Sequence, residues 1–198
     1  MKFLIFNGKI LKYEDINLRE FYMTNSLQLT QKIWFGYGGI PLFSQNIELL
    51  IHQAEILHIP LHGQIKNIKE LFRLSKRMLN KNKHYLSGFI IFKLISDGAS
   101  SIITASSVPY AVQGLPYNEQ GLLVVISEYK KFSDNRLNQY YFFNQPLWDS
   151  ILFSLKGTLY NNAVILNEQN NICECAYGNI YLVKGDEIFT PSLSTGCY

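Results

Sequence analysis

Residues 165–193 read ILNEQNNICECAYGNIYLVKGDEIFTPSL, a series of short apolar segments interrupted by residues that favour tight turns. The interruptions are Asn170-Asn171 and Gly185-Asp186, which tolerate the positive φ angles that two-residue hairpin turns require. Segments rich in Ile, Val, Leu and aromatic residues between such turns are typical of antiparallel strands. The sequence predicts strands at 163–167, 171–175, 179–184 and 186–190.

The same pattern occurs at the N-terminus, where KFLIF at residues 2–6 is followed by Asn7-Gly8 and then by KILKY. An Asn-Gly pair between two apolar runs is a strong signal for a hairpin. Further along the chain, β-rich runs are separated by turn-forming residues such as Asp97-Gly98. These runs predict strands at 89–96, 101–110 and 121–129.

Two segments of the first half have the apolar spacing of amphipathic helices. Residues 44–59 begin with Ser44, a preferred N-cap residue, and are followed by Pro60, which cannot continue a helix. Residues 64–82 form the second predicted helix. The first half of the chain is therefore expected to combine strands with two helices.

Residues 130–145 lose this periodicity and carry polar turn-forming residues, which predicts a linker between two domains. Pro146 suits the first turn of a helix, so a third helix is predicted at 146–158. The four short strands described above follow it. The chain is predicted to have an α+β fold in two parts, with antiparallel strands predominating.

Composition favours an ordinary globular protein, because 47% of the 198 residues are apolar and 17% are charged. The net charge is +3, and the densest basic cluster, at the end of a predicted helix, contains Lys76, Arg77, Lys81 and Lys83. No nucleic-acid-binding motif accompanies the cluster, so a solvated helix face is favoured over a nucleic-acid site. We expect no nucleic acid partner.

No segment has the length of a signal-peptide core or a membrane span, so a cytoplasmic protein without a membrane partner is expected. The three cysteines, Cys173, Cys175 and Cys197, lack the paired spacing of a zinc site and are interpreted as reduced thiols. His58 and His62 are separated by Pro60, which argues against a helical metal pair. No metal is expected.

A glycine-rich segment, Gly36-Tyr37-Gly38-Gly39, has the composition of a phosphate-binding loop. It lacks the Lys-Ser/Thr pair and the helix start that complete a P-loop. A turn between a strand and Pro41 is the simpler interpretation.

The second half resembles the fold-type IV class of pyridoxal phosphate enzymes, the branched-chain and D-amino acid aminotransferases and aminodeoxychorismate lyase. The resemblance depends on Glu174, on Asn179-Ile180-Tyr181 and on Thr190-Pro191. It implies a two-domain, D-amino acid aminotransferase-like fold with an N-terminal α/β domain at 1–129, a linker at 130–145 and a C-terminal α+β domain at 146–198. Because family members continue beyond the residues that match Tyr198, the second domain is expected to be incomplete.

The resemblance also implies a cofactor site. Glu174 matches the glutamate that holds the pyridine nitrogen, which keeps the ring protonated as an electron sink. Asn179 and Arg19 match further cofactor-binding positions. The alternative for Glu174 is a simple cross-hairpin pair. Pyridoxal phosphate is the cofactor implied by the family.

Several residues depart from the family pattern. Tyr141 occupies the position of the Schiff-base lysine, while Asn144 keeps the asparagine that follows it. A tyrosine cannot form the imine that this chemistry needs. Leu49 stands at the position of the arginine that binds the cofactor phosphate, so binding of pyridoxal phosphate is doubtful. The aromatic residues 140–143 either stack a flat ligand or fill the vacated pocket, and filling is favoured.

These departures predict a non-catalytic class IV homologue that acts as a binding or partner subunit, either as a homodimer or as a heterodimer with an active paralogue. The alternative is an active pyridoxal phosphate-dependent aminotransferase or aminodeoxychorismate lyase that acts on an amino acid or an amino-chorismate type substrate. In that case either the register of the alignment around Tyr141 differs or another lysine serves; the nearest lysines are Lys130, Lys131 and Lys156. A third hypothesis is an interaction domain that binds no small molecule.

Overall fold

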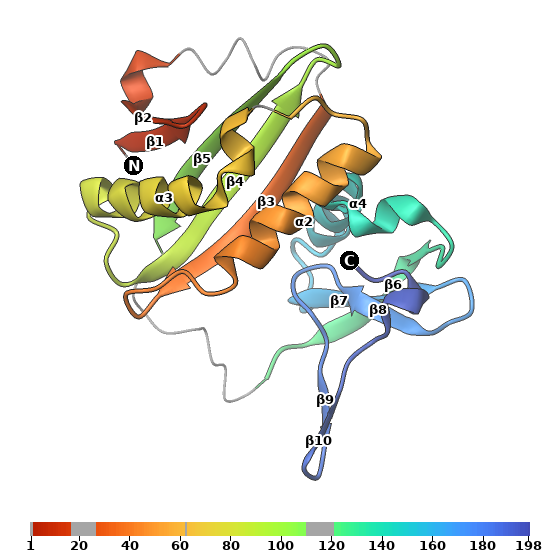
Figure 1. The fold of residues 1–198 in the computed structure, drawn as a ribbon. Coiled ribbons are helices and arrows are strands. Elements are labelled where there is room, and N and C mark those ends of the chain that lie inside the picture. Colours follow the sequence, from red (N-terminus) through yellow and green to blue (C-terminus); the bar gives the residue numbers. More distant parts are fainter. Residues whose placement is uncertain (1, 17–26, 62, 110–120) are drawn as a thin grey trace. The chain divides into compact units, whose positions relative to one another are not determined.

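The computed structural model describes residues 2–16, 27–61, 63–109 and 121–198, and the chain divides into two compact units, Met1–Gly114 and Leu115–Tyr198 (Figure 1). The division precedes the predicted linker at 130–145. That segment instead belongs to the second unit, where it contains the end of a strand, a short 3-10 helix and the start of a helix. Its loss of periodicity reflects these short elements.

The first unit contains a five-stranded antiparallel sheet with the strand order β2-β1-β5-β4-β3. The predicted N-terminal hairpin is confirmed: Phe6 pairs with Lys9, and Asn7 and Gly8 have φ angles of 44° and 77°. Strand β3 pairs with β4 along its whole length. The strands are β1 (Phe3–Phe6), β2 (Lys9–Lys12), β3 (Leu27–Gly36), β4 (Ser87–Ser96) and β5 (Ser101–Pro109).

Helices α2 (Phe43–Ile56) and α3 (Ile68–Asn82) lie across one face of this sheet, as Figure 1 shows. The predicted cap at Ser44 is wrong, because the N-cap residue is Leu42, which has a φ angle of 55° and makes no side-chain cap bond. Helix α3 is capped as sequence rules expect, since the Asn67 side chain accepts a hydrogen bond from Glu70 N at 3.1 Å. The short 3-10 helices are η1 (Tyr13–Asp15) and η2 (Gly63–Lys66).

The core of the first unit lies between these helices and the sheet. Phe43 makes edge-to-face contacts with Phe92 of β4 and Phe72 of α3, with ring centroids 5.8 and 5.2 Å apart. Aliphatic side chains from every layer surround these rings and are removed from water, which is the main stabilising contribution to such a core. Buried members include Leu4, Ile5, Leu29, Ile33, Ile47, Leu50, Leu71, Met78, Ile90 and Ile103.

The second unit contains a three-stranded sheet with the order β6-β7-β8 and a separate hairpin. Strand β6 runs parallel to β7, and helix α4 (Tyr141–Ser154) follows β6 and precedes β7 in the chain. A parallel pair needs such a crossover connection. The predicted hairpins β7–β8 and β9–β10 are confirmed. The strands are β6 (Val124–Lys131), β7 (Asn162–Asn167), β8 (Ile172–Cys175), β9 (Leu182–Lys184) and β10 (Glu187–Phe189).

Helix α4 packs on this sheet through Ile151, whose buried side chain belongs to a cluster with Ala163 and Ile165 of β7. The helix starts before Pro146, which therefore lies inside it rather than at its first turn. The start is held by Asn144, whose Nδ2 donates hydrogen bonds to the carbonyls of Asn138 and Tyr140 at 2.6 and 2.8 Å. This side-chain bonding explains why the helix begins earlier than predicted.

The remaining short helices of the second unit are η3 (Arg136–Gln139) and η4 (Leu193–Thr195). Over the ranges that the structure describes, no helix is both long and apolar enough to cross a membrane.

Asn82, the last residue of α3, fastens this helix to two strands. Its Oδ1 accepts hydrogen bonds from Lys2 N and Phe3 N at 2.9 and 2.8 Å, and its Nδ2 donates to Phe3 O at 2.7 Å and to Ser107 Oγ at 3.0 Å. We expect Asn82→Ala to lower the free energy of unfolding by about 2–3 kcal/mol, because partly buried polar groups lose their partners. Urea denaturation followed by circular dichroism measures this loss.

Asn80→Ala is the matched control, because Asn80 lies on the same helix and its side chain is exposed. We expect it to change the unfolding free energy by less than about 0.5 kcal/mol. Equal effects of the two substitutions would contradict the assigned role of Asn82.

Candidate functional site

Glu174, the predicted pyridine-binding residue, lies in the second unit under helix α4. It pairs across the β7–β8 ladder with Ile165, which faces the buried cluster beneath this helix, and paired residues of a sheet share a face. Only 5% of the Glu174 surface is exposed. The local hairpin thus directs a carboxylate into a protein interior.

Both oxygens of the Glu174 carboxylate accept hydrogen bonds from this chain. Oε1 accepts from Lys131 Nζ at 2.9 Å and from Trp148 Nε1 at 2.8 Å, while Oε2 accepts from the backbone N–H of Tyr198 at 2.7 Å. Strand β6 supplies Lys131, helix α4 supplies Trp148 and the C-terminal segment supplies Tyr198. Three separate elements therefore converge on one carboxylate.

The Lys131–Glu174 ion pair is buried, since the two side chains are 2% and 6% exposed. Within the described part of the chain, they are the two charged residues with buried side chains. Removing both charges from water costs several kcal/mol each, which their attraction offsets only when the geometry is good and further hydrogen bonds are made. Trp148 and Tyr198 provide those bonds to Glu174, so burial of the ion pair depends on both of them.

Three aromatic rings pack on one another beside this ion pair. The centroid of Tyr141 lies 5.5 Å from Trp148 and 6.1 Å from Tyr198, and Trp148 lies 5.4 Å from Tyr198, with interplanar angles of 65–68°. These are edge-to-face contacts, which aromatic pairs prefer. Although 40% of Tyr198 is exposed, desolvation raises the pKa of its hydroxyl, and Tyr141 and Glu174 raise it further. This hydroxyl stays protonated near neutral pH.

The structure brings some of the predicted site residues together. Tyr141 and Glu174 are joined through Trp148 and Tyr198, which contact both. Asn179 is exposed in the segment between β8 and β9. Arg19 lies outside the described residues.

Three residues of the site, Lys131, Trp148 and Tyr198, are not among those that the sequence predicts. In the sequence, Lys131 is one of the lysines nearest to Tyr141, and it falls in the predicted linker at 130–145. The available signal was the β-rich run that precedes it, which extends through residue 131 and places this lysine next to Asn167 of β7. Lys131 and Glu174 are 43 residues apart in the sequence, so local sequence patterns do not predict that they form a pair.

Leu49, the residue that stands at the predicted position of the phosphate-binding arginine, lies on helix α2 in the first unit. Leu49 is exposed and Leu50 is fully buried in the core. Asn46 accepts a hydrogen bond from Gln31 Nε2 at 2.5 Å and donates one to Leu42 O at 2.7 Å. None of these side chains carries a charge that could neutralise a phosphate.

The residues around Glu174 do not fit a lysine-linked pyridoxal phosphate. Tyr141, at the predicted lysine position, has no amine, and both Glu174 oxygens are already engaged within the chain. Lys131 has an amine, but it is bonded to the same carboxylate. The ring nitrogen and the imine carbon stand at opposite ends of the cofactor, so an amine at 2.9 Å from Glu174 leaves no room for a ring between them.

The three cysteines are free thiols. Burial raises the pKa of Cys173, whose Sγ donates to Thr195 O at 3.0 Å, and burial likewise raises the pKa of Cys175. Raised pKa values disfavour the thiolate that nucleophilic catalysis needs. No group of three or more His, Cys, Asp or Glu side chains arranged for a metal ion occurs in the described ranges, and His62 lies outside them.

We expect Lys131→Met to lower the free energy of unfolding by about 3–5 kcal/mol, because it leaves the Glu174 charge buried without a cation. The double variant Lys131→Met with Glu174→Gln should recover a large part of this loss, since no uncompensated charge remains. Chemical denaturation of the wild-type protein and both variants measures the difference. A double variant no more stable than Lys131→Met would show that the ion pair is not the source of the effect.

Comparison with known proteins identifies relatives of this chain. The chain is 22% identical to the probable branched-chain-amino-acid aminotransferases of Rickettsia bellii and Aquifex aeolicus, over 93% and 97% of its length. It spans 66% of the length of both relatives.

Solved structures show the same fold. The branched-chain amino acid aminotransferase of Escherichia coli matches with a TM-score of 0.79 and 18% identity, over 99% of this chain and 69% of that chain. The Thermobaculum terrenum enzyme in its holo form matches with a TM-score of 0.82 and 14% identity, over 99% and 68%. A putative 4-amino-4-deoxychorismate lyase from Legionella pneumophila matches with a TM-score of 0.67 and 18% identity, over 86% and 63%.

The α+β fold expected from the hairpin that carries Glu174 is thus confirmed by these structures. The family model for amino-transferase class IV matches residues 37–198, which includes the whole of the second unit and most of the described first unit. The chain belongs to the class IV aminotransferase family.

Proposed function

We propose that this protein is a non-catalytic class IV homologue, in which an internal ion pair replaces the contact between the family glutamate and the cofactor ring. The observation that carries the proposal is the Glu174 carboxylate, which accepts hydrogen bonds from Lys131, Trp148 and Tyr198. A carboxylate held in this way has no role left in stabilising a protonated pyridine.

The lysine position supports the same proposal. Tyr141 cannot supply an amine, and its ring packs edge-to-face against Trp148 and Tyr198. Of the two interpretations of the aromatic residues at 140–143, this packing favours filling of the vacated pocket, as does the burial of Tyr140, which is 2% exposed. The result is a stable scaffold whose chemistry has been lost.

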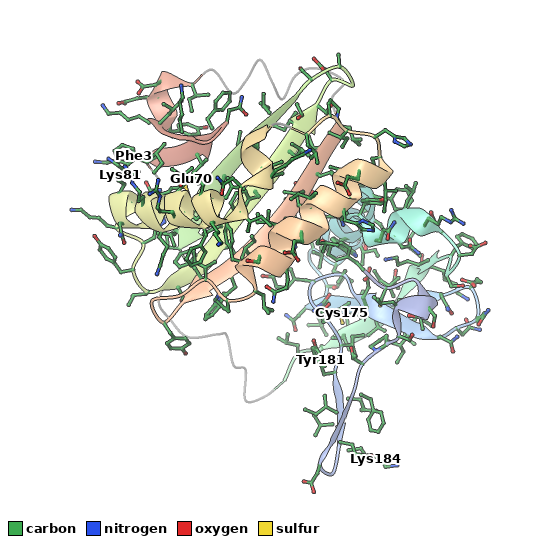
Figure 2. The ribbon with its side chains drawn as sticks, in the orientation of Figure 1. Phe3, Glu70, Lys81, Cys175, Tyr181 and Lys184 are labelled. Atoms are coloured by element: carbon green, nitrogen blue, oxygen red, sulfur yellow. The ribbon has the colours of Figure 1, made fainter. Side chains whose placement is uncertain are left out.

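The function of such a scaffold is association, as a homodimer or as a heterodimer with an active relative. The second unit offers a surface for this role in the β9–β10 hairpin, on which Figure 2 labels Lys184, with Tyr181 directly before β9. Val183 and Ile188 pair across the two strands and are 66% and 70% exposed. Apolar side chains at such exposure are typical of surfaces that a partner covers.

A second candidate function is supported by Lys131. Its buried amine lies close to Glu174, which matches the family glutamate. Lys131 could therefore take the place of the family's Schiff-base lysine. In that case the protein is an active pyridoxal phosphate-dependent aminotransferase or lyase, and Lys131 must leave Glu174 when the cofactor binds.

Titration with pyridoxal phosphate, followed by borohydride reduction and peptide mass mapping, separates the two functions. We expect no saturable visible absorbance band and no lysine adduct at stoichiometric cofactor. A reduced adduct on Lys131 that is absent from Lys131→Met and present in Lys130→Met would overturn the proposal. Lys130 is a matched control, because its Nζ bonds Asn170 rather than Glu174.

Replacement of the lost amine provides a complementary test. We expect Tyr141→Lys, combined with Lys131→Met, to bind pyridoxal phosphate as a reducible adduct at residue 141, because the pair of substitutions frees Glu174 and restores an amine at the family position. Tyr141→Phe with Lys131→Met is the control and should form no adduct. Equal behaviour of the two double variants, with both folded, would refute the assignment of Tyr141 to the lysine position.

A further inference from the structure

The first unit carries a groove along one side of helix α3. It consists of two hollows of about 400 and 310 Å³ that share Ile40 as a common wall. The groove has an apolar lining that includes Phe72, Leu79 and Leu86, and the cations Lys69 and Lys76 also line it. All of these residues belong to the first unit, whereas the residues of the Glu174 site belong to the second.

The helix side of the groove follows from sequence spacing. Ile68, Phe72, Lys76 and Asn80 are four residues apart, and such residues form one continuous row on a helix surface. The row runs along both hollows. The groove is therefore as long as most of α3, which suits an elongated ligand better than a compact one.

The chain segment that contains α3 carries mostly positive charge. Seven of the 18 Lys and Arg residues of the chain fall within residues 66–83, together with a single acid, Glu70. Glu70 forms an ion pair with Arg73 at 2.9 Å, and Figure 2 shows Glu70 and Lys81 along this helix. No Asp or Glu is among the described residues that line either hollow. The groove is thus complementary to a negatively charged partner.

The groove also exposes apolar surface. Leu42 is 65% exposed and has a left-handed φ angle of 55°, a conformation that a leucine rarely adopts. Leu86 is 62% exposed on the other hollow. Exposed aliphatic side chains that flank apolar hollows provide sites for the side chains of a partner.

We propose that this groove binds an acidic polypeptide segment, whose apolar side chains enter the two hollows while its carboxylates meet Lys69 and Lys76. Single-stranded nucleic acid has the same charge but needs open aromatic faces on which bases stack. Phe72, which lines the first hollow, is packed edge-to-face against Phe43 at 5.2 Å and has the Lys76 ammonium 5.5 Å from its centroid. Two of the other aromatic side chains that line the hollows, Phe35 and Phe43, are buried, and Tyr85 is 64% exposed. A single exposed ring does not offer the successive stacking faces that a strand of bases needs, so a peptide is favoured.

Fluorescence anisotropy of a labelled peptide tests the proposal on the full chain. The probe is about twelve residues long, with Leu or Phe every third or fourth residue and Glu between them. We expect saturable binding that weakens when salt is raised from about 0.05 to about 0.5 M. A peptide with Lys in place of every Glu should bind at least tenfold more weakly, and equal binding of the two peptides would overturn the proposal.

Exposed residues supply the variants, so folding is preserved. Lys69→Glu with Lys76→Glu should weaken binding of the acidic peptide at least tenfold, and Leu86→Asp should weaken it by a similar factor. Lys66→Glu with Arg77→Glu changes the net charge equally on the same part of the chain, outside the groove lining, and should change binding less than threefold. Equal losses in the two double variants would show general attraction rather than a groove.

An oligothymidylate of similar length provides the alternative ligand. Binding of this strand by the wild-type protein without binding of the acidic peptide would overturn the proposal in favour of nucleic acid. These measurements contain no pyridoxal phosphate, so their result is independent of whether the Glu174 site is catalytic.

Discussion

The buried ion pair between Lys131 and Glu174 connects the three-stranded sheet of the second unit with helix α4 and the C-terminal segment. Lys131 ends strand β6, Glu174 lies in β8, and the carboxylate also bonds Trp148 of α4 and the backbone of Tyr198. A charge in a protein interior requires its partners to be in place, whereas an apolar contact tolerates some displacement. The pair therefore fixes the relative positions of the sheet, the helix and the C-terminal segment.

Under the proposed function, this arrangement also explains how the scaffold of a cofactor enzyme can persist without its cofactor. In the family that the sequence resembles, the glutamate faces a positively charged ring nitrogen of the cofactor. Here the ammonium of Lys131 supplies the positive charge, and the rings of Tyr141, Trp148 and Tyr198 supply the apolar surface. Both physical requirements of the site, a counter-charge and a filled volume, are met by side chains of the chain itself.

Features controlled by local chemistry could be predicted from the sequence. Asn7-Gly8, Asn170-Asn171 and Gly185-Asp186 predicted three hairpins correctly, because the residues in the turn determine its conformation. The start of α4 could not be predicted from Pro146, since it depends on the bonds that Asn144 makes to Asn138 and Tyr140. The Lys131–Glu174 pair depends on the register of three strands, and neither residue type nor spacing reveals it.

The strand order of the first unit has a consequence for how the protein is made. Strand β1 pairs with its neighbour β2, but its other edge pairs with β5, so that Ile5 lies opposite Ala105. A chain that leaves the ribosome from its N-terminus can form the first hairpin at once, yet one edge of that hairpin has no partner until the region around residue 105 has emerged. During synthesis the exposed edge is open to pairing with other nascent chains, a risk that translation speed and chaperone binding would control.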